Sequence, residues 1–275
     1  MTIHNAFRTS VALSVMRALR GVPAGAWRRD DRWQGGAYAG SGFFIRRWVL
    51  DNLEAAPQAA AAAGGSTRGA APSRSDEAAG ASKGAKLLRR LRRFLDGLAA
   101  RALLTRLGGV KLSGNSTVTA TLFRHGDHLG PHSDVATDEA AEDSARRRLG
   151  FTWHLSPQWA AERGGELVFF CPFEQVGIVF NSLTIFSVGG GSTHMVLPVV
   201  EDQHAPLTAE AATEAEEEEE DETLEPWAEA PDAAASHRLS ISGWFKTTDH
   251  ARAVGVESMV VSMQPCDATP PLFNT

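Results

Sequence analysis

The strongest constraint on the fold is a strict alternation of apolar and polar residues in several short segments. In residues 151–156, the apolar side chains of Phe, Trp and Leu alternate with Thr, His and Ser. Residues 117–122 repeat the pattern, with threonines between the apolar positions. Successive side chains of a β-strand point to opposite faces, so one face of each segment would pack and the other would line a polar space. The pattern favours a sheet that encloses a polar-lined pocket.

Glycine-rich turns separate these segments. Gly164-Gly165 and Gly189-Gly190-Gly191 are most simply tight connections, because neither leads from a strand into a helix as a phosphate-binding loop does. A further turn is expected at Gly114-Asn115, and a short apolar strand over residues 183–188. This spacing predicts a mainly β fold with flanking helices, built on a double-stranded β-helix (jelly-roll) core.

A metal site is indicated by His132-Ser133-Asp134, which places an imidazole and a carboxylate on the same face of an extended segment. His194 lies in residues 192–199, a segment typical of a strand that would meet the pair across the barrel. Two histidines and one carboxylate on one side of an ion form the facial triad typical of non-heme Fe(II), with three coordination positions left open.

A second His-x-Asp sequence, His125-Gly126-Asp127, competes for this role. Its glycine and its neighbours favour a turn between strands, where His125 and Asp127 would be solvated. The isolated histidines are assigned no role, because single histidines more often lie on the surface. They are His4, His204 and His250.

Arg238 begins a segment whose polar face is unusual for a core strand. Alternation places Arg238, Ser240 and Ser242 on one face and two apolar residues on the other. A guanidinium is a planar fork that fits a carboxylate, and a hydroxyl two residues later can add a hydrogen bond. The ligand expected here is a dicarboxylate.

These sequence motifs occur in the same order as in a known protein family. From about residue 117 to 245, the sequence resembles the Fe(II)/2-oxoglutarate-dependent dioxygenases of the prolyl hydroxylase type, and most of all the branch that acts on folded or ribosomal proteins and related bacterial enzymes. Five motifs carry the resemblance: Phe123-Arg-His-Gly-Asp-His-Leu-Gly-Pro-His132-Ser-Asp134, Arg147-Arg-Leu-Gly-Phe-Thr-Trp-His-Leu-Ser-Pro-Gln-Trp159, Gly164-Gly-Glu-Leu-Val-Phe, His194 with Val196 and Pro198, and Arg238-Leu-Ser-Ile-Ser-Gly-Trp-Phe.

The resemblance implies a role for each site residue. His132, Asp134 and His194 would hold Fe(II), and Arg238, assisted by Ser240, would bind the distal carboxylate of 2-oxoglutarate. O2 is the other cosubstrate and ascorbate the expected reductant. The implied substrate is a prolyl residue in a protein or peptide.

The sequence departs from the family at two positions. Many relatives have a tyrosine where this chain has Phe123, which has no hydrogen bond to donate toward the cosubstrate. Prolyl hydroxylases often have another tyrosine where this chain has His154. This histidine would donate to the distal carboxylate, and add charge if protonated, or else only satisfy a neighbouring polar group. Both changes leave iron binding intact and bear on prolyl specificity.

Residues 1–112 are expected to form two helices that buttress the barrel. Helical spacing predicts the first over residues 11–21, with Ser10 as its cap, and a longer one over about 86–107. Between them, residues 56–82 consist mainly of Ala, Gly and Ser, a composition that predicts a disordered loop.

The oxygenase core is expected over residues 113–248, interrupted by an acidic, disordered insertion at about 201–236. Loop-closure cost rises slowly with length, so such an insertion is tolerable. The simplest interpretation is that the insertion has no role, and the alternative is that it is a docking arm for a basic partner. The tail, residues 249–275, is assigned no role.

Charge divides unevenly along the chain. Residues 1–112 contain 19 Lys and Arg against 7 Asp and Glu, and the rest contain 8 against 26. Four arginines lie on the polar side of the second helix, where a solvated face is the simplest interpretation and contact with ribosomal RNA or another nucleic acid is the alternative. They are Arg89, Arg90, Arg92 and Arg93. No run of 18 apolar residues exists, which argues against a membrane span.

The compartment is predicted from weaker signals. Two cysteines, Cys171 and Cys266, are too few for a disulfide framework and favour a reducing compartment, with Cys171 in the core. Residues 1–29 contain arginines and no acidic residue, as organellar transit peptides do. Because the first helix lies there, the cytoplasm or nucleus is preferred.

Three functions remain open from sequence. The first is hydroxylation of a prolyl residue in a protein, and the second is a 2-oxoglutarate oxygenase that acts on another amino acid or small molecule. The third is an inactive barrel that serves as a binding scaffold. An intact metal set with Arg238 argues against the scaffold, which needs none of these residues.

Overall fold

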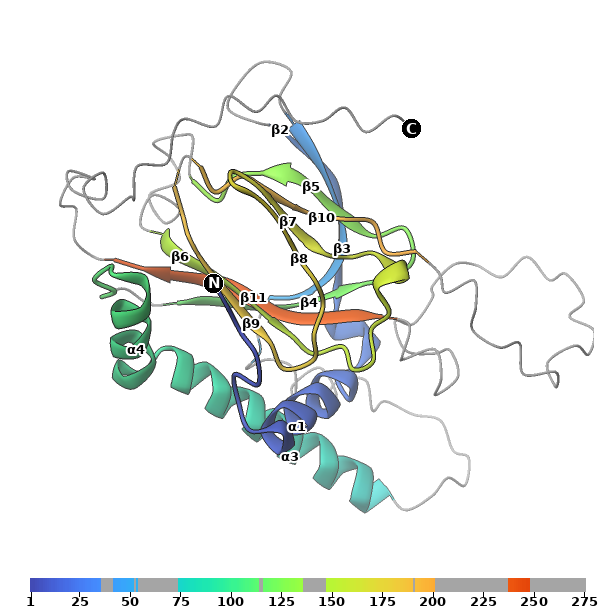
Figure 1. Cartoon of the computed structure of the whole chain (residues 1–275). Helices are drawn as coiled ribbons and strands as arrows, with labels where there is room; N and C mark the ends of the chain where they lie inside the picture. The colour runs from blue at the N-terminus through green and yellow to red at the C-terminus, as the bar shows by residue number, and fades with distance from the viewer. Residues whose placement is uncertain are drawn as a thin grey trace, which may run out of the picture.

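The computed structural model describes residues 1–35, 42–51, 53, 74–113, 116–135, 147–189, 191–200 and 237–247, without the side chains of residues 34–35, 42–43 and 74–82. Within them, the α-helices are α1 (Thr9–Arg20), α3 (Arg74–Leu95) and α4 (Leu98–Gly108), and two short 3-10 helices cover Ala24–Ala26 and Ala161–Arg163. Figure 1 shows the helices gathered below the sheet.

The strands form one antiparallel sheet that curls into two facing layers (Figure 1). The lower layer runs in the order β1 (Thr2–Ile3), β9 (Leu183–Ser187), β6 (Arg147–His154), β11 (Arg238–Lys246) and β4 (Thr117–Phe123). The upper layer runs β5 (His128–His132), β10 (His194–Val196), β7 (Leu167–Phe170) and β8 (Phe173–Val176). The strand β3 (Gly42–Leu50) joins the layers by pairing with both β4 and β5, and β2 (Arg28–Gly35) pairs with β3.

The topology is that of a jelly roll. The eight strands from β4 to β11 are shared between the layers, with the order β9-β6-β11-β4 in one and β5-β10-β7-β8 in the other. Two interlocked Greek keys give this arrangement. The predicted fold class, a mainly β protein with flanking helices around a jelly-roll core, is therefore confirmed.

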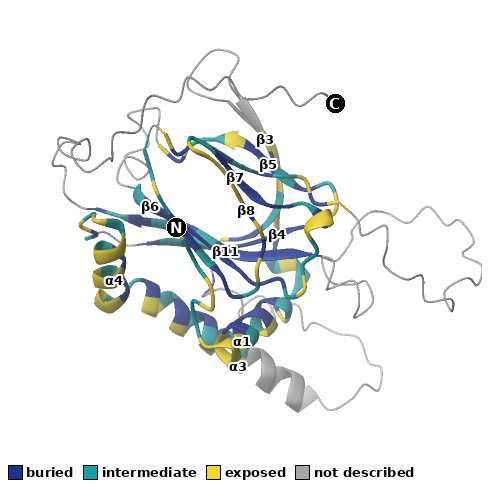
Figure 2. Cartoon of the chain, viewed as in Figure 1, coloured by how far each residue is buried: buried dark blue, intermediate teal, exposed yellow. Residues whose placement is uncertain are grey.

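Two apolar clusters hold the layers in place. The outer face of the lower layer packs against the helices, and Trp153 and Ile241 lie in one buried cluster with Leu19 of α1 and Leu88 of α3. Figure 2 shows the helices buried on the side that faces the sheet and exposed on the other. The second cluster lies between the layers and includes Phe123. The predicted alternation in residues 151–156 and in β11 is confirmed, because their apolar residues face the helices.

The helices differ from the predicted ones at their ends. The helix α1 begins at Thr9, so Ser10 lies inside it and is not the cap. The structure places residues 74–82 in α3, so the predicted loop does not extend over them, and residues 54–73 lie outside the described residues. The predicted helix over 86–107 is interrupted at Asp96-Gly97, where the Asp96 carboxylate accepts hydrogen bonds from the backbone and hydroxyl of Ser116 at 3.0 and 2.6 Å.

The prediction that the four arginines of the second helix form a solvated face is correct only in part. Arg90 and Arg93 are exposed. Arg92 instead donates to Asp96 at 2.8 Å and to the carbonyl of Ser116 at 2.6 Å, which ties α3 to the start of β4.

Several sequence predictions concern other regions. Cys171 is half-buried in the turn between β7 and β8 and is disulfide-bonded, so the prediction of a reduced core thiol is wrong.

The acidic segment, residues 201–236, and the tail, residues 249–275, lie outside the described residues, as does Gly114-Asn115. Among the described helices, none is both long and apolar enough to cross a membrane.

The hairpin of β2 and β3 was not predicted. Charged residues dominate β2, and this composition obscured its extended structure. A usable signal was present, since the aromatic and β-branched residues of β3 follow a glycine-containing connection, as in a hairpin.

Candidate metal centre

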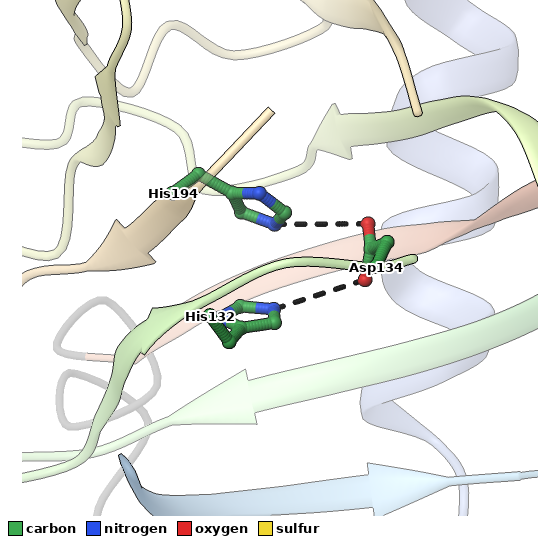
Figure 3. Close-up of side chains that lie close together, drawn as sticks. All are labelled: His132, Asp134 and His194. Carbon is green, nitrogen blue, oxygen red and sulfur yellow. Dashed lines mark ion pairs between the residues drawn. The ribbon is translucent and has the colours of Figure 1, made fainter. Parts of the chain in front are cut away.

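The structure brings together the three predicted metal ligands. His132 ends β5 and His194 begins β10, and the two residues are partners in the antiparallel register. Asp134 follows β5 by two residues. One potential ligand atom from each side chain lies within 4.8 Å of the others. Figure 3 shows both imidazoles directed toward the carboxylate, and Nε2 of each lies 3.8 Å from an oxygen of Asp134.

Backbone carbonyls fix the orientation of both rings. Nδ1 of His132 lies 2.9 Å from the carbonyl of Gly130, and Nδ1 of His194 lies 2.7 Å from that of Ser192. A proton on Nδ1 completes each bond and leaves the lone pair on Nε2, the atom that faces Asp134. Burial, followed by the charge of His194, lowers the pKa of His132 to about 4, so this ring is neutral at physiological pH.

Aromatic side chains pack against the site. The His194 ring contacts the adjacent rings of Phe169 and Phe186, with centroids 5.5 and 5.0 Å away, and lies 4.3 Å from the His132 ring. These aromatic rings limit the access of water and keep the metal-ligand atoms in a low-dielectric environment. Two imidazoles and one carboxylate fit a divalent ion with an open face, and Fe(II) is the metal typical of this set.

Arg238 lies at the start of β11, fully buried at 1% exposure and opposite Phe123 in the register. Its guanidinium carbon lies 4.8 Å from the centre of the Phe123 ring. Burial lowers the pKa of Arg238 to about 10, with Glu166 opposing this shift and Arg47 adding to it. The guanidinium therefore stays charged at neutral pH, and within the described residues its Nε makes no hydrogen bond. A buried cation with an unused donor fits a carboxylate ligand.

His154 and Ser240 are neighbours of Arg238 in the sheet. They are register partners between β6 and β11, and Ser240 Oγ lies 2.8 Å from Thr121 Oγ1. His154 is fully buried, and neither ring nitrogen has a hydrogen-bond partner in the described part of the chain. Burial, followed by the charge of Arg238, lowers the pKa of His154 to about 3. His154 is therefore neutral at neutral pH when no ligand is bound.

Glycine is required beside Arg238. Gly165 has a φ of +78°, and a Cβ there would lie 2.9 Å from Cδ of Arg238. At Gly164, with a φ of +65°, a Cβ would lie 2.3 Å from the carbonyl oxygen of Pro198. The sequence interpretation of these glycines as a tight connection is thus incomplete, because Gly165 also makes room for the guanidinium stem.

Three charged residues near the pocket were not assigned a role from sequence. Glu166 is buried, and its Oε2 makes no hydrogen bond within the described residues. Arg47 of β3 pairs with the buried Asp30 of β2, with Nε 3.5 Å from Oδ2. Glu166 lies in the Gly-Gly-Glu motif noted in the sequence. Arg47 and Asp30 could not be placed near the pocket from sequence, because the β2–β3 hairpin was not predicted.

The competing His125-Gly126-Asp127 sequence forms the expected turn, with Gly126 at a φ of +77°. His125 is exposed, as predicted. Asp127 is not solvated as predicted, because it is 1% exposed and pairs with Arg29 at 2.9 Å. Its carboxylate also accepts a hydrogen bond from the backbone of Arg124 at 2.8 Å, so it has a structural role in the turn.

Solved structures give distant matches. A prolyl-4-hydroxylase from Pseudomonas putida is 15% identical, with 90% of this chain and 92% of that chain covered and a TM-score of 0.47. A prolyl hydroxylase from Trichoplax adhaerens, solved with a peptide fragment of hypoxia inducible factor, is 15% identical, with coverage of 90% and 82% and a TM-score of 0.44. An oxidoreductase of the 2OG-Fe(II) oxygenase family from Burkholderia pseudomallei is 12% identical, with coverage of 89% and 84% and a TM-score of 0.43.

Comparison with curated proteins gives no match. The family comparison does give one, and residues 118–208 match the 2OG-Fe(II) oxygenase superfamily. The matched segment contains all three residues of the candidate metal site. This family match agrees with the resemblance to the Fe(II)/2-oxoglutarate-dependent dioxygenases seen in the sequence.

Proposed function

We propose that the protein is an Fe(II)- and 2-oxoglutarate-dependent dioxygenase that hydroxylates a C–H bond, with a prolyl residue of a protein as the substrate. The observation that carries the proposal is the presence in one jelly roll of a His-Asp-His donor set and a buried arginine with an unused donor. A metal site alone fits many functions, whereas the added carboxylate site is what a 2-oxoglutarate enzyme requires. The prolyl substrate rests on the sequence motifs.

Each residue then has a defined task. Nε2 of His132, Nε2 of His194 and the carboxylate of Asp134 would hold the iron. With 2-oxoglutarate and O2, the bound iron supplies the oxidising power that hydroxylates an unactivated C–H bond and releases succinate and CO2. The carbonyls of Gly130 and Ser192 keep both imidazoles in the tautomer that binds metal.

The other end of the pocket binds and orients the cosubstrate. Arg238 would hold the distal carboxylate of 2-oxoglutarate, with Phe123 packed against the guanidinium. Neutral His154 has a ring N–H to donate to the same carboxylate, and Ser240 adds a hydroxyl that it shares with Thr121. Phe169 and Phe186 would exclude water around His194.

An oxygenase for another amino acid is the second candidate. Phe123 and His154 favour it, because they replace the tyrosines of prolyl hydroxylases without disturbing the donor set. Incubation of purified protein with Fe(II), 2-oxoglutarate and ascorbate, followed by mass spectrometry of candidate basic proteins, separates the two. A single added oxygen on proline supports the first candidate, and on another residue the second.

The metal ligands are tested by His132→Ala and Asp134→Ala. Each should lose bound iron, measured by elemental analysis, and should abolish Fe(II)-dependent formation of succinate. His125→Ala is the matched control, since it alters the exposed histidine of the other His-x-Asp sequence and should retain both. Undiminished succinate formation in either ligand variant would show that the ligands are misassigned.

A further inference from the structure

Arg47 occupies the inner face of β3, although its neighbours in sequence point outward. Ile45 and Val49, two residues away on either side, are buried, and Ile45 lies in the apolar cluster between the layers with Phe123. Side chains two apart on a strand share a face. Arg47 is 21% exposed, against 50% for the adjacent Arg46, which points the other way.

The register places Arg47 in line with the cosubstrate end of the pocket. Arg238 of β11 pairs with Phe123 of β4. On the far side of β4, Trp48 and Val49 of β3 pair with Leu122 and Thr121, so the next position along sets Arg47 beside Phe123. Arg238 and Arg47 are thus the residues on either side of Phe123 in three adjacent strands. The charge of Arg47 lowers the pKa of Arg238, after the larger effect of burial, as expected for two cations that share one space.

Asp30 orients Arg47 without using its whole donor set. The two residues are partners in the β2–β3 register, and Nε of Arg47 lies 3.5 Å from the Asp30 carboxylate without a hydrogen bond. The same buried carboxylate pairs with Arg32 at 2.8 Å and with Arg28 at 3.7 Å. Because Asp30 is shared among three arginines, it does not engage the whole guanidinium of Arg47, which has five donors in a fixed fork.

We propose that Arg47, oriented by Asp30, is a second carboxylate-binding residue of the pocket, on the other side of Phe123 from Arg238. This inference rests on the proposed function and adds that the pocket recognises more than the distal carboxylate of the cosubstrate. The carboxylate comes either from the 2-oxo acid end of 2-oxoglutarate or from an acidic group on the substrate. Both sources share the same chemistry, a planar anion that pairs with a planar fork.

The test measures binding by calorimetry, with Mn(II) in place of Fe(II) so that no turnover occurs. The variants are Arg47→Gln, which removes the charge, and Arg47→Lys, which keeps the charge without the fork. The matched control is Arg32→Gln, which removes an arginine that shares Asp30 but is 60% exposed. The probes are 2-oxoglutarate and then N-acetyl-L-proline, a prolyl carboxylate, added to protein saturated with 2-oxoglutarate.

A tenfold or larger loss of 2-oxoglutarate affinity in Arg47→Gln assigns the carboxylate to the cosubstrate. An unchanged 2-oxoglutarate affinity with a tenfold loss for N-acetyl-L-proline assigns it to the substrate. In either case Arg47→Lys should recover part of the loss, and Arg32→Gln should stay within twofold of the unaltered protein.

The proposal is overturned if Arg47→Gln binds both probes as the unaltered protein does, or if Arg32→Gln loses as much affinity as Arg47→Gln. Failure of the unaltered protein to bind 2-oxoglutarate would instead overturn the proposed function itself, which distinguishes the two failures.

Discussion

The two ends of the pocket are prepared for their ligands in different ways. At the metal end, both imidazoles have their Nδ1 atoms bonded to backbone carbonyls, and Nε2 of each faces Asp134. At the arginine end, Nε of Arg238, both nitrogens of His154 and Oε2 of Glu166 are buried without a hydrogen bond in the described residues. Backbone bonds thus orient the imidazoles of the first end, whereas packing holds Arg238 and His154 at the second.

This difference indicates where binding energy should be concentrated. A buried polar group without a partner costs about 1 to 3 kcal/mol, and a ligand that supplies the partner recovers this cost. The metal end needs only an ion to complete an arrangement that its own hydrogen bonds already hold. The arginine end needs an anion of defined shape, so its variants should change cosubstrate binding more than metal binding.

The largest expected effect is that of Arg238→Ala. Loss of the charged partner of a buried carboxylate should weaken 2-oxoglutarate by about 2 to 5 kcal/mol, or roughly 30-fold to 5,000-fold. Binding of Mn(II), measured separately by calorimetry, should change little, because Arg238 contributes no ligand atom to the donor set. Equal loss of metal and cosubstrate would show that the two ends are not independent. An unchanged cosubstrate affinity would contradict the assignment of Arg238.

A smaller effect is expected from Gly165→Ala. The added Cβ would lie 2.9 Å from Cδ of Arg238 at a backbone φ of +78°, so the arginine must move and the backbone is strained. We expect a loss of about 1 to 2 kcal/mol of stability from the strain, and about tenfold weaker 2-oxoglutarate binding from the displaced guanidinium. Gly177→Ala is the matched control, since a Cβ there has no atom of the described residues within 4 Å. Unaltered cosubstrate binding in Gly165→Ala would mean that packing does not position Arg238.

Local patterns were enough to predict the strands that carry the site. The alternation in β6 and β11 identified which residues face the pocket, and the spacing of His132 and Asp134 identified a metal pair, because both signals are complete within a few residues of sequence. The structure adds only how the strands are paired, which brings His194 opposite His132.

Long-range partners explain what the sequence did not reveal. Asp127 resembles a solvated turn residue until Arg29, 98 positions earlier, is placed against it. The break between α3 and α4 depends likewise on Asp96 bonding to Ser116, 20 residues later. Arg47 was missed for the same reason, since its charge resembles an ordinary surface charge unless the β2–β3 register is known.

The last expected effect concerns acid stability, and it separates the contributions of the two ends by titration. Burial lowers the pKa of His154 to about 3, from 6.5 when exposed to solvent. Because the unfolded chain then takes up a proton that the folded chain does not, the free energy of unfolding should fall as the pH falls from 6.5 toward 3, by up to about 1 kcal/mol per pH unit. His154→Gln, which does not titrate, should reduce this slope in urea unfolding series between pH 6 and 4. His132, whose pKa is lowered to about 4, adds a slope of the same sign from the metal end, and this share should remain in His154→Gln. A slope that is the same in His154→Gln and the unaltered protein would show that this ring is not held neutral beside Arg238.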